Sequence, residues 1–341
     1  MINKALLVYT VKALLRDNKG LLAMDESNDT CNKRFAKLSI PQNLDSRRDW
    51  RELIVGTEGL NNFISGAILY DETIRQKKKD GTLIIDSLMK EGIIPGIKVD
   101  TGAKNLAAHP GEKITEGLDG LRERLMEYAG MGARFAKWRA VIDIDKGIPS
   151  TSCLEANANA LARFAALCQE ANMVPIVEPE VLMDGDHDLE QSYSVTEKVL
   201  RMVFNQLYQQ RIFLQGILLK PSMVMPGLNH AEKSSIDEIA EKTIQCFLES
   251  VPASVGGIVF LSGGQSPELA SSHLNAMHIK YKSSLPWPLS FSFARAIQQP
   301  AMNIWKGKEA NIRMAQQALL YRAKCNHEAV SGQYQEELKL S

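Results

Sequence analysis

The segment RFAKWRAVIDIDKGIPSTSCLEANANALARFAALCQEANMVPIVEPE, residues 134–180, places two apolar runs on either side of a long helical pattern. The first run ends at Arg139, and the pattern CLEANANALARFAALC over 153–168 repeats its apolar positions at helical spacing. The second run begins at Val174, about 40 residues after the first, which is the room that a strand, a crossover helix and two loops require. The segment therefore predicts two parallel strands joined by a helix.

The same alternation extends through the chain of 341 residues, of which 45% are apolar. Eight apolar runs can be counted, and almost every one finishes in an ionisable or hydroxyl residue. They are GLLAMD ending at Asp25, SGAILYD at Asp71, PGIKVD at Asp100, RFAKWR at Arg139, VPIVEPE at Glu180, LQGILLK at Lys220, GGIVFLS at Ser262 and LSFSFAR at Arg295. Between them lie helical patterns such as SIDEIAEKTIQCFL, residues 235–248, which starts with a capping serine. Eight strands alternating with helices predict a single α/β domain, a closed (β/α)8 TIM barrel.

The ends of the chain fall outside this alternation. We expect a short helical extension before the first strand, and a polar, loosely held tail from about His327 to residue 341. The N-terminal apolar stretch soon meets Lys12 and Arg16, and no later run of about eighteen apolar residues follows, so we expect neither secretion nor a membrane span. No glycine-rich nucleotide loop follows any strand, which disfavours an open doubly wound sheet.

Charge and composition exclude several functional classes. Forty basic residues balance forty acidic ones, so we expect no nucleic-acid or anionic-membrane partner. Five widely spaced cysteines without a CxxC pair are expected to be reduced thiols in a cytoplasmic compartment. Only DGDHD, Asp184–Asp188, places a histidine among carboxylates, and a charged turn or a helix cap is the favoured interpretation. We therefore predict no metal and no cofactor, and the absence of a GxSxG elbow disfavours a serine nucleophile.

Charged residues end most of the runs, and in a parallel barrel those ends meet on the face that carries the active site. Pairs spaced by two share a strand face; they are Lys98 with Asp100, Lys137 with Arg139, and Glu178 with Glu180. A buried ion pair or a helix cap is an equal alternative for any single pair. Because desolvated charges are unfavourable unless partnered, the whole set favours a ligand site. At the run ends, five cations outnumber three anions, and this local excess indicates an anionic substrate; the cations are Lys98, Lys137, Arg139, Lys220 and Arg295, and the anions are Asp25, Glu178 and Glu180.

The last two runs indicate where a phosphate binds. Ser262, Gly263 and Gly264 supply a hydroxyl and backbone N–H groups after the seventh run, a common phosphate site in barrels. Arg295, after the eighth run, can bind phosphate through its fork.

Lys220 is the candidate nucleophile. It follows the apolar residues ILL and precedes Pro221, so we expect its amine in a desolvated place near other cations. Such surroundings favour the neutral amine, which can attack a ketone. The iminium that results withdraws electrons from the neighbouring carbon–carbon bond and permits retro-aldol cleavage without a cofactor. The equal alternative is that Lys220 ends a strand and pairs with a carboxylate.

Seven ordered segments across nearly the whole chain resemble the class I fructose-1,6-bisphosphate aldolases. They are LLAMDES from residue 21, GIKVD from 96, FAKWR from 135, PIVEPE from 175, LLKPSMV from 218, FLSGGQS from 260 and FSFAR from 291. The resemblance implies a metal-independent lyase that reversibly cleaves fructose 1,6-bisphosphate to dihydroxyacetone phosphate and glyceraldehyde 3-phosphate in glycolysis and gluconeogenesis. Sedoheptulose 1,7-bisphosphate is a plausible second substrate, and a homo-oligomer, tetramer or dimer, is implied.

The resemblance also implies residue roles. Lys220 would form the Schiff base, Glu178 would act as acid and base in carbinolamine formation and dehydration, and Asp25 would handle the proton of the C4 hydroxyl. Lys137 and Glu180 would support these steps, and Lys98 and Arg139 would help to bind substrate. Phosphate would be held by Ser262, Gly263 and Arg295 on the dihydroxyacetone side and by Lys33 with Arg34 near the other phosphate, with Thr30 and Ser292 as further contacts.

Three departures from the family pattern stand out. NDTCNKRF after Ser27 replaces a glycine- and serine-containing turn around Thr30, and Ala294 replaces a glycine whose N–H would meet phosphate. The end EELKLS lacks a terminal tyrosine, and we expect Tyr334 to be an ordinary surface residue. Two alternatives stay open: another Schiff-base barrel enzyme of transaldolase type, and a catalytically silent sugar-phosphate-binding or scaffolding paralogue.

Overall fold

A computed structural model describes residues 2–335. Over these residues, eight parallel strands close into a barrel in the order β1-β10-β9-β8-β7-β6-β3-β2. They are β1 (Gly20–Ala23), β2 (Ile64–Leu69), β3 (Ile94–Lys98), β6 (Phe135–Ile142), β7 (Val174–Val181), β8 (Leu218–Leu219), β9 (Ile258–Phe260) and β10 (Leu289–Phe293). Each strand overlaps one of the eight predicted runs, and the predicted (β/α)8 TIM barrel is confirmed.

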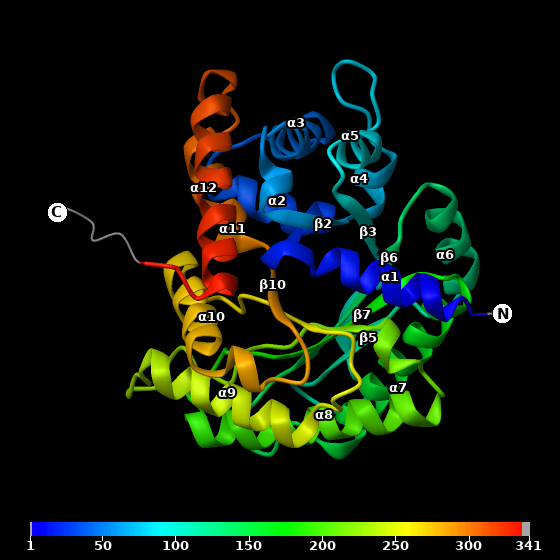
Figure 1. Ribbon diagram of the computed structural model, residues 1–341, viewed down its shortest axis with the longest axis vertical. Coiled ribbons are helices and arrows are strands. Elements are labelled where there is room, and N and C mark those ends of the chain that lie inside the picture. Colours follow the sequence, from blue (N-terminus) through cyan, green and yellow to red (C-terminus); the bar gives the residue numbers. More distant parts are fainter. Residues whose placement is uncertain (1, 336–341) are drawn as a thin grey trace.

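Helices surround the barrel, and those that follow one another from α7 to α10 pack side by side (Figure 1). They are α1 (Lys4–Leu14), α2 (Asn28–Ala36), α3 (Leu44–Val55), α4 (Asp71–Arg75), α5 (Ile84–Lys90), α6 (Leu121–Gly130), α7 (Thr151–Glu170), α8 (Leu189–Gln209), α9 (Ile236–Ser250), α10 (Pro267–Tyr281), α11 (Arg295–Trp305) and α12 (Ile312–Ser331). Capping boxes begin two of them. Ser235 with Glu238 caps α9, and Asp188 with Gln191 caps α8, so the segment DGDHD ends in a helix cap.

The predicted N-terminal helix is α1, which covers the amino-terminal end of the barrel. Its residues Leu7, Val11 and Leu14 are buried. They belong to one apolar cluster with barrel residues Leu21, Ala23, Ile68, Phe135, Val174, Ile176, Leu218 and Val259. The contact is close, because a Cβ added at Gly66 in β2 would lie 2.7 Å from Cδ2 of Leu14. A substrate site is therefore left to the carboxyl ends of the strands.

An antiparallel hairpin, β4 (Gly102–Asn105) with β5 (Lys113–Glu116), stands outside the barrel after β3 and was not predicted. Its strands have four residues each and are largely accessible to solvent, so they show no apolar run. The hydroxyl of Thr115 donates to the carbonyl of Arg139 at 2.8 Å, which attaches the hairpin to β6.

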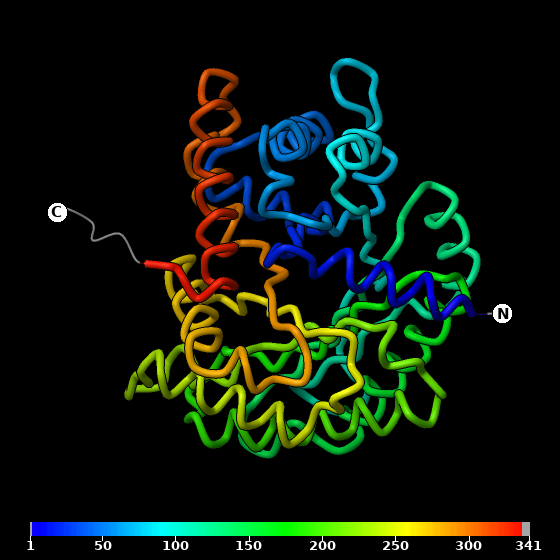
Figure 2. The backbone as a smooth tube through the Cα atoms, viewed as in Figure 1, coloured from blue at the N-terminus to red at the C-terminus, as the bar shows by residue number. Residues whose placement is uncertain are grey.

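The predicted tail begins later than expected. Helix α12 continues to Ser331 beside α10 and α11 (Figure 2), and Gly332, at φ 72°, ends it in a left-handed conformation. Tyr334 is only 8% exposed, and its backbone N–H donates to Asn275 Oδ1 at 3.0 Å. The prediction of a surface tyrosine is therefore wrong, because this stretch packs against α10. Residues 336–341, the rest of the predicted tail, lie outside the described residues.

Candidate active site

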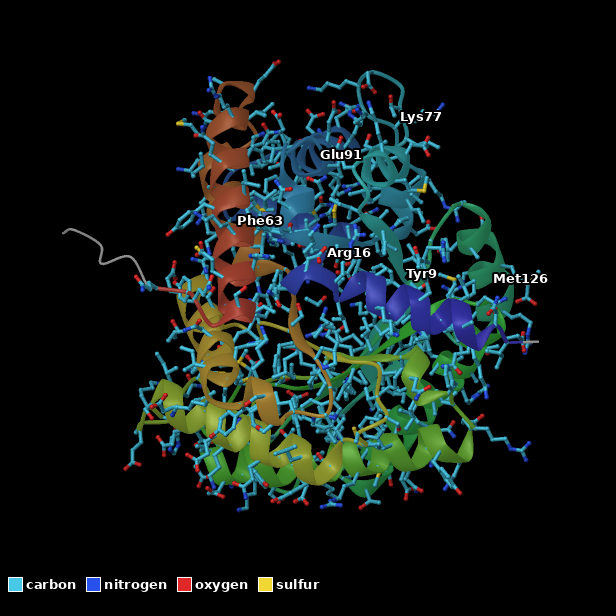
Figure 3. The ribbon with its side chains drawn as sticks, viewed as in Figure 1. Tyr9, Arg16, Phe63, Lys77, Glu91 and Met126 are labelled. Atoms are coloured by element: carbon cyan, nitrogen blue, oxygen red, sulfur yellow. The ribbon has the colours of Figure 1, made fainter. Side chains whose placement is uncertain are left out.

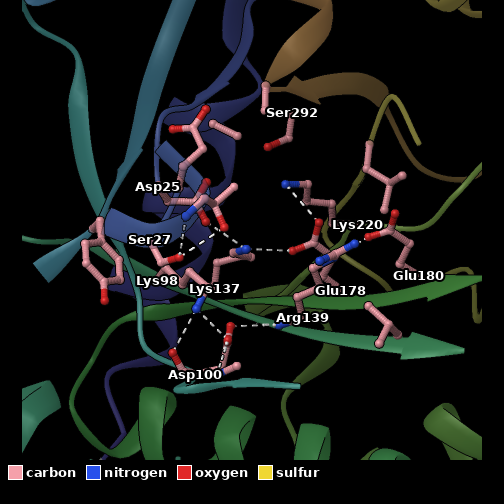
Figure 4. A pocket seen from close by; sticks show the side chains of 18 of the residues that line it. Asp25, Ser27, Lys98, Asp100, Lys137, Arg139, Glu178, Glu180, Lys220 and Ser292 are labelled. Carbon is pink, nitrogen blue, oxygen red and sulfur yellow. Dashed lines mark hydrogen bonds and ion pairs between the residues drawn. The ribbon is translucent and has the colours of Figure 1, made fainter. Parts of the chain in front are cut away.

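One polar cavity of about 480 Å³ opens at the carboxyl ends of the strands. The predicted site residues that line it are Asp25, Thr30, Arg34, Lys98, Lys137, Arg139, Glu178, Glu180, Lys220, Ser262, Gly263, Ser292 and Arg295. Figure 4 shows several of these side chains pointing toward one another from different strands. The rule that strand ends meet on one face therefore located the cavity from sequence.

A chain of four buried ionic side chains crosses the cavity (Figure 4). Nζ of Lys220 lies 3.1 Å from Oε1 of Glu178. The other oxygen of Glu178 lies 3.0 Å from Nζ of Lys137, and that amine lies 2.8 Å from Oδ2 of Asp25. These ion pairs thus link strands β6 and β7 with the residues that follow β8 and β1, with carboxylate and amine alternating. The alternative interpretation of Lys220 was that it pairs with a carboxylate. Glu178 is such a partner, and it is also placed to exchange protons with Lys220.

The alternation keeps both carboxylates ionised. Burial acts to raise the pKa of Asp25, but Lys137 and Lys220 outweigh it and lower that pKa to about 2. Burial likewise opposes ionisation of Glu178, and again Lys137 and Lys220 prevail and lower its pKa. Burial disfavours the ammonium of Lys137, yet Asp25 and Glu178 raise its pKa above the ordinary value. At neutral pH, Asp25 and Glu178 are therefore proton acceptors that a protonated Lys137 holds together.

Replacing Lys137 with methionine is expected to destabilise the fold by about 3 kcal/mol at about pH 8, because two buried carboxylates lose their shared cation. Glu178 keeps Lys220 at 3.1 Å, whereas Asp25 loses its ion-pair partner, so burial then raises the pKa of Asp25 above that of the unfolded chain. The variant's deficit should therefore shrink as the pH falls and Asp25 takes up a proton. Urea unfolding at about pH 8 and about pH 5.5 measures this difference. A deficit that is equal at the two pH values would contradict the electrostatic explanation.

A second group of charges forms the wall across β3, β6 and β7. Nζ of Lys98 lies 2.6 Å from Oδ1 of Asp100, whose Oδ2 accepts from the backbone N–H of Arg139 at 3.2 Å. Arg139 in turn pairs with Glu180. Burial opposes the charge of Arg139, but Glu180 raises its pKa. These residues form a fixed polar wall on one side of the cavity.

The opposite wall has the character of an anion site. Gly263 and Gly264 have φ of 58° and 96°, a left-handed turn that glycine adopts readily. Ala294, at φ −104°, needs no such freedom, so alanine is compatible with this position. It precedes Arg295, the first residue of α11, and gives that helix no side-chain cap. The N–H of Ile297 donates to the carbonyl of Ala294, which leaves the N–H groups of Arg295 and Ala296 for a ligand. The buried hydroxyl of Ser292 also lines the cavity without a hydrogen-bond partner among the described residues.

Gly264 and Lys33 are the two predicted site residues that do not line the cavity. The side chain of Lys33 is exposed, whereas Arg34 lines the cavity. Consecutive residues of a helix point about 100° apart, so α2 can turn only one of them inward. Sequence reasoning did not identify Glu26 and Tyr70, which also line the cavity. The position of Glu26, directly after Asp25, was the available signal.

Among residues 2–335, no group of three or more His, Cys, Asp or Glu side chains is placed to hold a metal ion. All five cysteines are free and buried. In this part of the chain no helix has both the length and the apolar character needed to cross a membrane.

Comparisons with known proteins agree with one another. A family model described as "Fructose-bisphosphate aldolase class-I" matches residues 6–341. The chain is 54% identical to a probable fructose-bisphosphate aldolase class 1 of Xanthomonas campestris pv. campestris, over 96% of this chain and 98% of the relative. It is 48% identical to a fructose-bisphosphate aldolase of Dictyostelium discoideum, over 96% and 92% of the two chains. Among solved structures, it is similar to fructose-bisphosphate aldolase from Plasmodium falciparum in complex with TRAP and a small-molecule inhibitor, with TM-score 0.95, 44% identity, and coverage of 97% and 95%.

Proposed function

The chain belongs to the class I fructose-bisphosphate aldolase family, a family of lyases, and from this premise we propose how its cavity cleaves fructose 1,6-bisphosphate. The observation that supports the proposal is the buried chain of Lys220, Glu178, Lys137 and Asp25. It places an amine nucleophile and two ionised carboxylates within one polar cavity.

The first step is formation of the Schiff base. Glu178, 3.1 Å from Nζ, takes a proton from the ammonium of Lys220, and the neutral amine that results attacks C2 of the ketone. A proton moves from the nitrogen to the C2 oxygen and gives the carbinolamine. Glu178 then returns its proton to the C2 hydroxyl, which leaves as water. The product is an iminium between Lys220 and C2, which serves as the electron sink that the reaction needs.

The second step breaks the bond between C3 and C4. Asp25 takes the proton of the C4 hydroxyl, the C4 oxygen forms a carbonyl, and the electrons of the C3–C4 bond move into the iminium. Glyceraldehyde 3-phosphate leaves, and an enamine stays on Lys220. The enamine takes a proton at C3, for which Glu178 is the proposed source once the proton that Asp25 took up has passed to it through Lys137. Water then hydrolyses the iminium, which releases dihydroxyacetone phosphate and restores the ammonium of Lys220.

The sites proposed for the two substrate phosphates follow from the positions of Lys220 and Asp25. Lys220 holds C2 and Asp25 serves C4, so C1 lies toward β9 and β10 and the far end of the substrate lies toward the segment after β1. The phosphate on C1 is assigned to Ser262, Gly263, Ser292 and Arg295, and the phosphate on C6 to Thr30, Arg34 and Lys98, with Arg139 and Glu180 lining the wall between them. Lys33 is left out because its side chain does not reach the cavity.

Replacing Arg295 with alanine is expected to lower kcat/KM about 10- to 100-fold for both fructose 1,6-bisphosphate and fructose 1-phosphate, because a charge-assisted contact to the shared phosphate is lost. Steady-state kinetics on the two substrates measures this. A loss confined to the bisphosphate would show that the two phosphate assignments are reversed.

A coupled assay on fructose 1,6-bisphosphate, with and without a chelator, tests the proposed function. Equal cleavage under both conditions is expected, because the amine supplies the electron sink. Activity that disappears with the chelator would contradict the proposal, as would a complete lack of cleavage without it.

We also propose a homo-oligomer, dimer or tetramer, in a reducing cytoplasmic setting. The buried, free cysteines support the setting. Tyr9 and Met126, labelled in Figure 3, are more than half exposed, and such apolar surface supports contacts between copies. Light scattering after size exclusion measures the mass.

A further inference from the structure

A buried ion-pair cluster lies beside Asp25, and of its three residues only Arg34 has a role in the proposed function, at the phosphate on C6. Its centre is Glu26, whose two carboxylate oxygens are divided between two arginines. Oε1 pairs with Arg34 of α2, and Oε2 lies 2.9 Å from Nη1 of Arg51 of α3. Nη2 of Arg51 also donates to the backbone carbonyl of Glu26 at 3.4 Å. Arg51 therefore contacts Glu26 through both its carboxylate and its backbone.

The three residues differ in their access to substrate. Glu26 and Arg34 line the cavity, whereas Arg51 does not and is only 2% exposed. Nη2 of Arg34 donates to Oε1 of Gln299 in α11 at 3.2 Å, so the guanidinium is held from two sides. Its Nε is buried and has no hydrogen-bond partner among the described residues. Arg34 is thus fixed at the cavity with its buried Nε–H donor unused.

The charges of the cluster explain why a second arginine is present. With Arg34 alone, Glu26 would neutralise the cation that faces the cavity. Arg51 takes one carboxylate oxygen, which leaves the cluster with one net positive charge at the cavity wall. Burial opposes ionisation of Glu26, but Arg51 and Arg34 outweigh it and lower its pKa, so the carboxylate stays charged at neutral pH.

We infer that Arg51 is a positioning residue for the phosphate at the end of the substrate remote from Lys220. It holds Glu26, Glu26 orients Arg34, and Arg34 binds that phosphate. The inference rests on the proposed function, in which Asp25 serves C4 and the segment after Asp25 faces the C6 end. It follows that Arg51, outside the cavity, sets the preference for fructose 1,6-bisphosphate over fructose 1-phosphate, which lacks the remote phosphate.

Replacing Arg51 with lysine tests this inference, because lysine keeps the charge but lacks the planar fork that reaches two acceptors. We expect kcat/KM for fructose 1,6-bisphosphate to fall about tenfold, equal to about 1.4 kcal/mol, mainly through a higher KM. We expect kcat/KM for fructose 1-phosphate to change by no more than about twofold, which corresponds to a barrier change of about 0.4 kcal/mol or less. In the Arg34→Ala background, Arg51→Lys should cause no further loss, because both act on one contact.

Arg47→Lys is the matched control. Arg47 lies one turn earlier in α3 and forms a similar fork to Glu72, with Nη2 2.7 Å from Oε2 and Nε 2.7 Å from Oε1. Neither residue lines the cavity. This variant should lose a comparable ion pair without changing the ratio between the two substrates. Glu26→Gln, which removes the charge that orients Arg34, should lower that ratio as Arg51→Lys does, and it provides the test if Arg51→Lys does not fold.

Three results would overturn the inference: equal losses for both substrates, the same change of ratio in Arg47→Lys, or an additive loss in the Arg34→Ala background. Borohydride trapping with dihydroxyacetone phosphate separates this failure from that of the proposed function. If the unaltered enzyme is not trapped, the proposed function fails. If Arg51→Lys is trapped normally and its substrate ratio is unchanged, only the inference fails.

Discussion

Replacing Lys220 with methionine is expected to lower cleavage of fructose 1,6-bisphosphate by at least about 10⁴-fold, because no nucleophile remains to form the electron sink. Borohydride reduction in the presence of dihydroxyacetone phosphate should label the peptide that carries Lys220 in the unaltered enzyme and should label nothing in the variant. Mass spectrometry of the digest measures both. The fold should persist, since Glu178 keeps Lys137 at 3.0 Å as its partner.

Lys98→Met is the matched control for this experiment. Lys98 is a second lysine in the cavity, and its amine donates to both the carboxylate and the carbonyl of Asp100, at 2.6 and 2.9 Å. It is assigned to substrate binding, so this variant should still be labelled at Lys220. Labelling that disappears in Lys98→Met and persists in Lys220→Met would show that Lys98 is the nucleophile.

Replacing Asp25 with asparagine is expected to lower cleavage about 10³-fold while Schiff-base trapping is preserved. Asparagine keeps the shape of the side chain but cannot accept the proton of the C4 hydroxyl. Trapping depends on Lys220 and Glu178, which Asp25 reaches only through Lys137. In this variant, single-turnover cleavage should therefore fall while borohydride trapping persists. A trapping loss as large as the cleavage loss would show that Asp25 acts before the bond breaks.

The pKa of Asp25 adds a condition to this prediction. Because that pKa is about 2 in the free enzyme, Asp25 is already ionised throughout the neutral range. A loss of kcat/KM between about pH 7 and about pH 5 therefore cannot arise from its protonation in the free enzyme. Asp100→Asn, at a carboxylate that pairs with Lys98 instead, is the control, and it should retain cleavage better than Asp25→Asn.

The barrel could be predicted from sequence because its strands are buried on both faces and therefore read as apolar runs. The hairpin of β4 and β5 could not, since Gly102–Asn105 is mostly solvent-accessible and has no such run. The tail was misjudged for a related reason. The end of α12 is polar overall, but Ala329 and Val330 lie on its buried side, and a mean over the segment hides one buried face.

Most of the charged cavity residues shared a local signal, a position at or near the end of an apolar run. Thr30, Arg34 and Ser292 came only from the family resemblance. Lys33 came from it too, as the partner of Arg34, although neighbours on a helix diverge in direction. The pair of Glu26 and Arg51 could not be identified, because 25 positions separate an ordinary loop glutamate from a helical arginine and no local pattern relates them. Only the packing of α3 against the end of β1 brings the two charges together.

The position of α1 imposes an order on the reaction. Because that helix covers the amino-terminal end of the barrel, the cavity opens at the carboxyl ends of the strands, and both products must leave by this route. In the proposed mechanism the aldehyde is unattached after bond cleavage, whereas the three-carbon fragment is still covalently bound to Lys220, which is only 3% exposed. Glyceraldehyde 3-phosphate therefore departs first and dihydroxyacetone phosphate second. In the direction of synthesis the order of events is reversed. The ketone must enter and become attached before the aldehyde can occupy the opening.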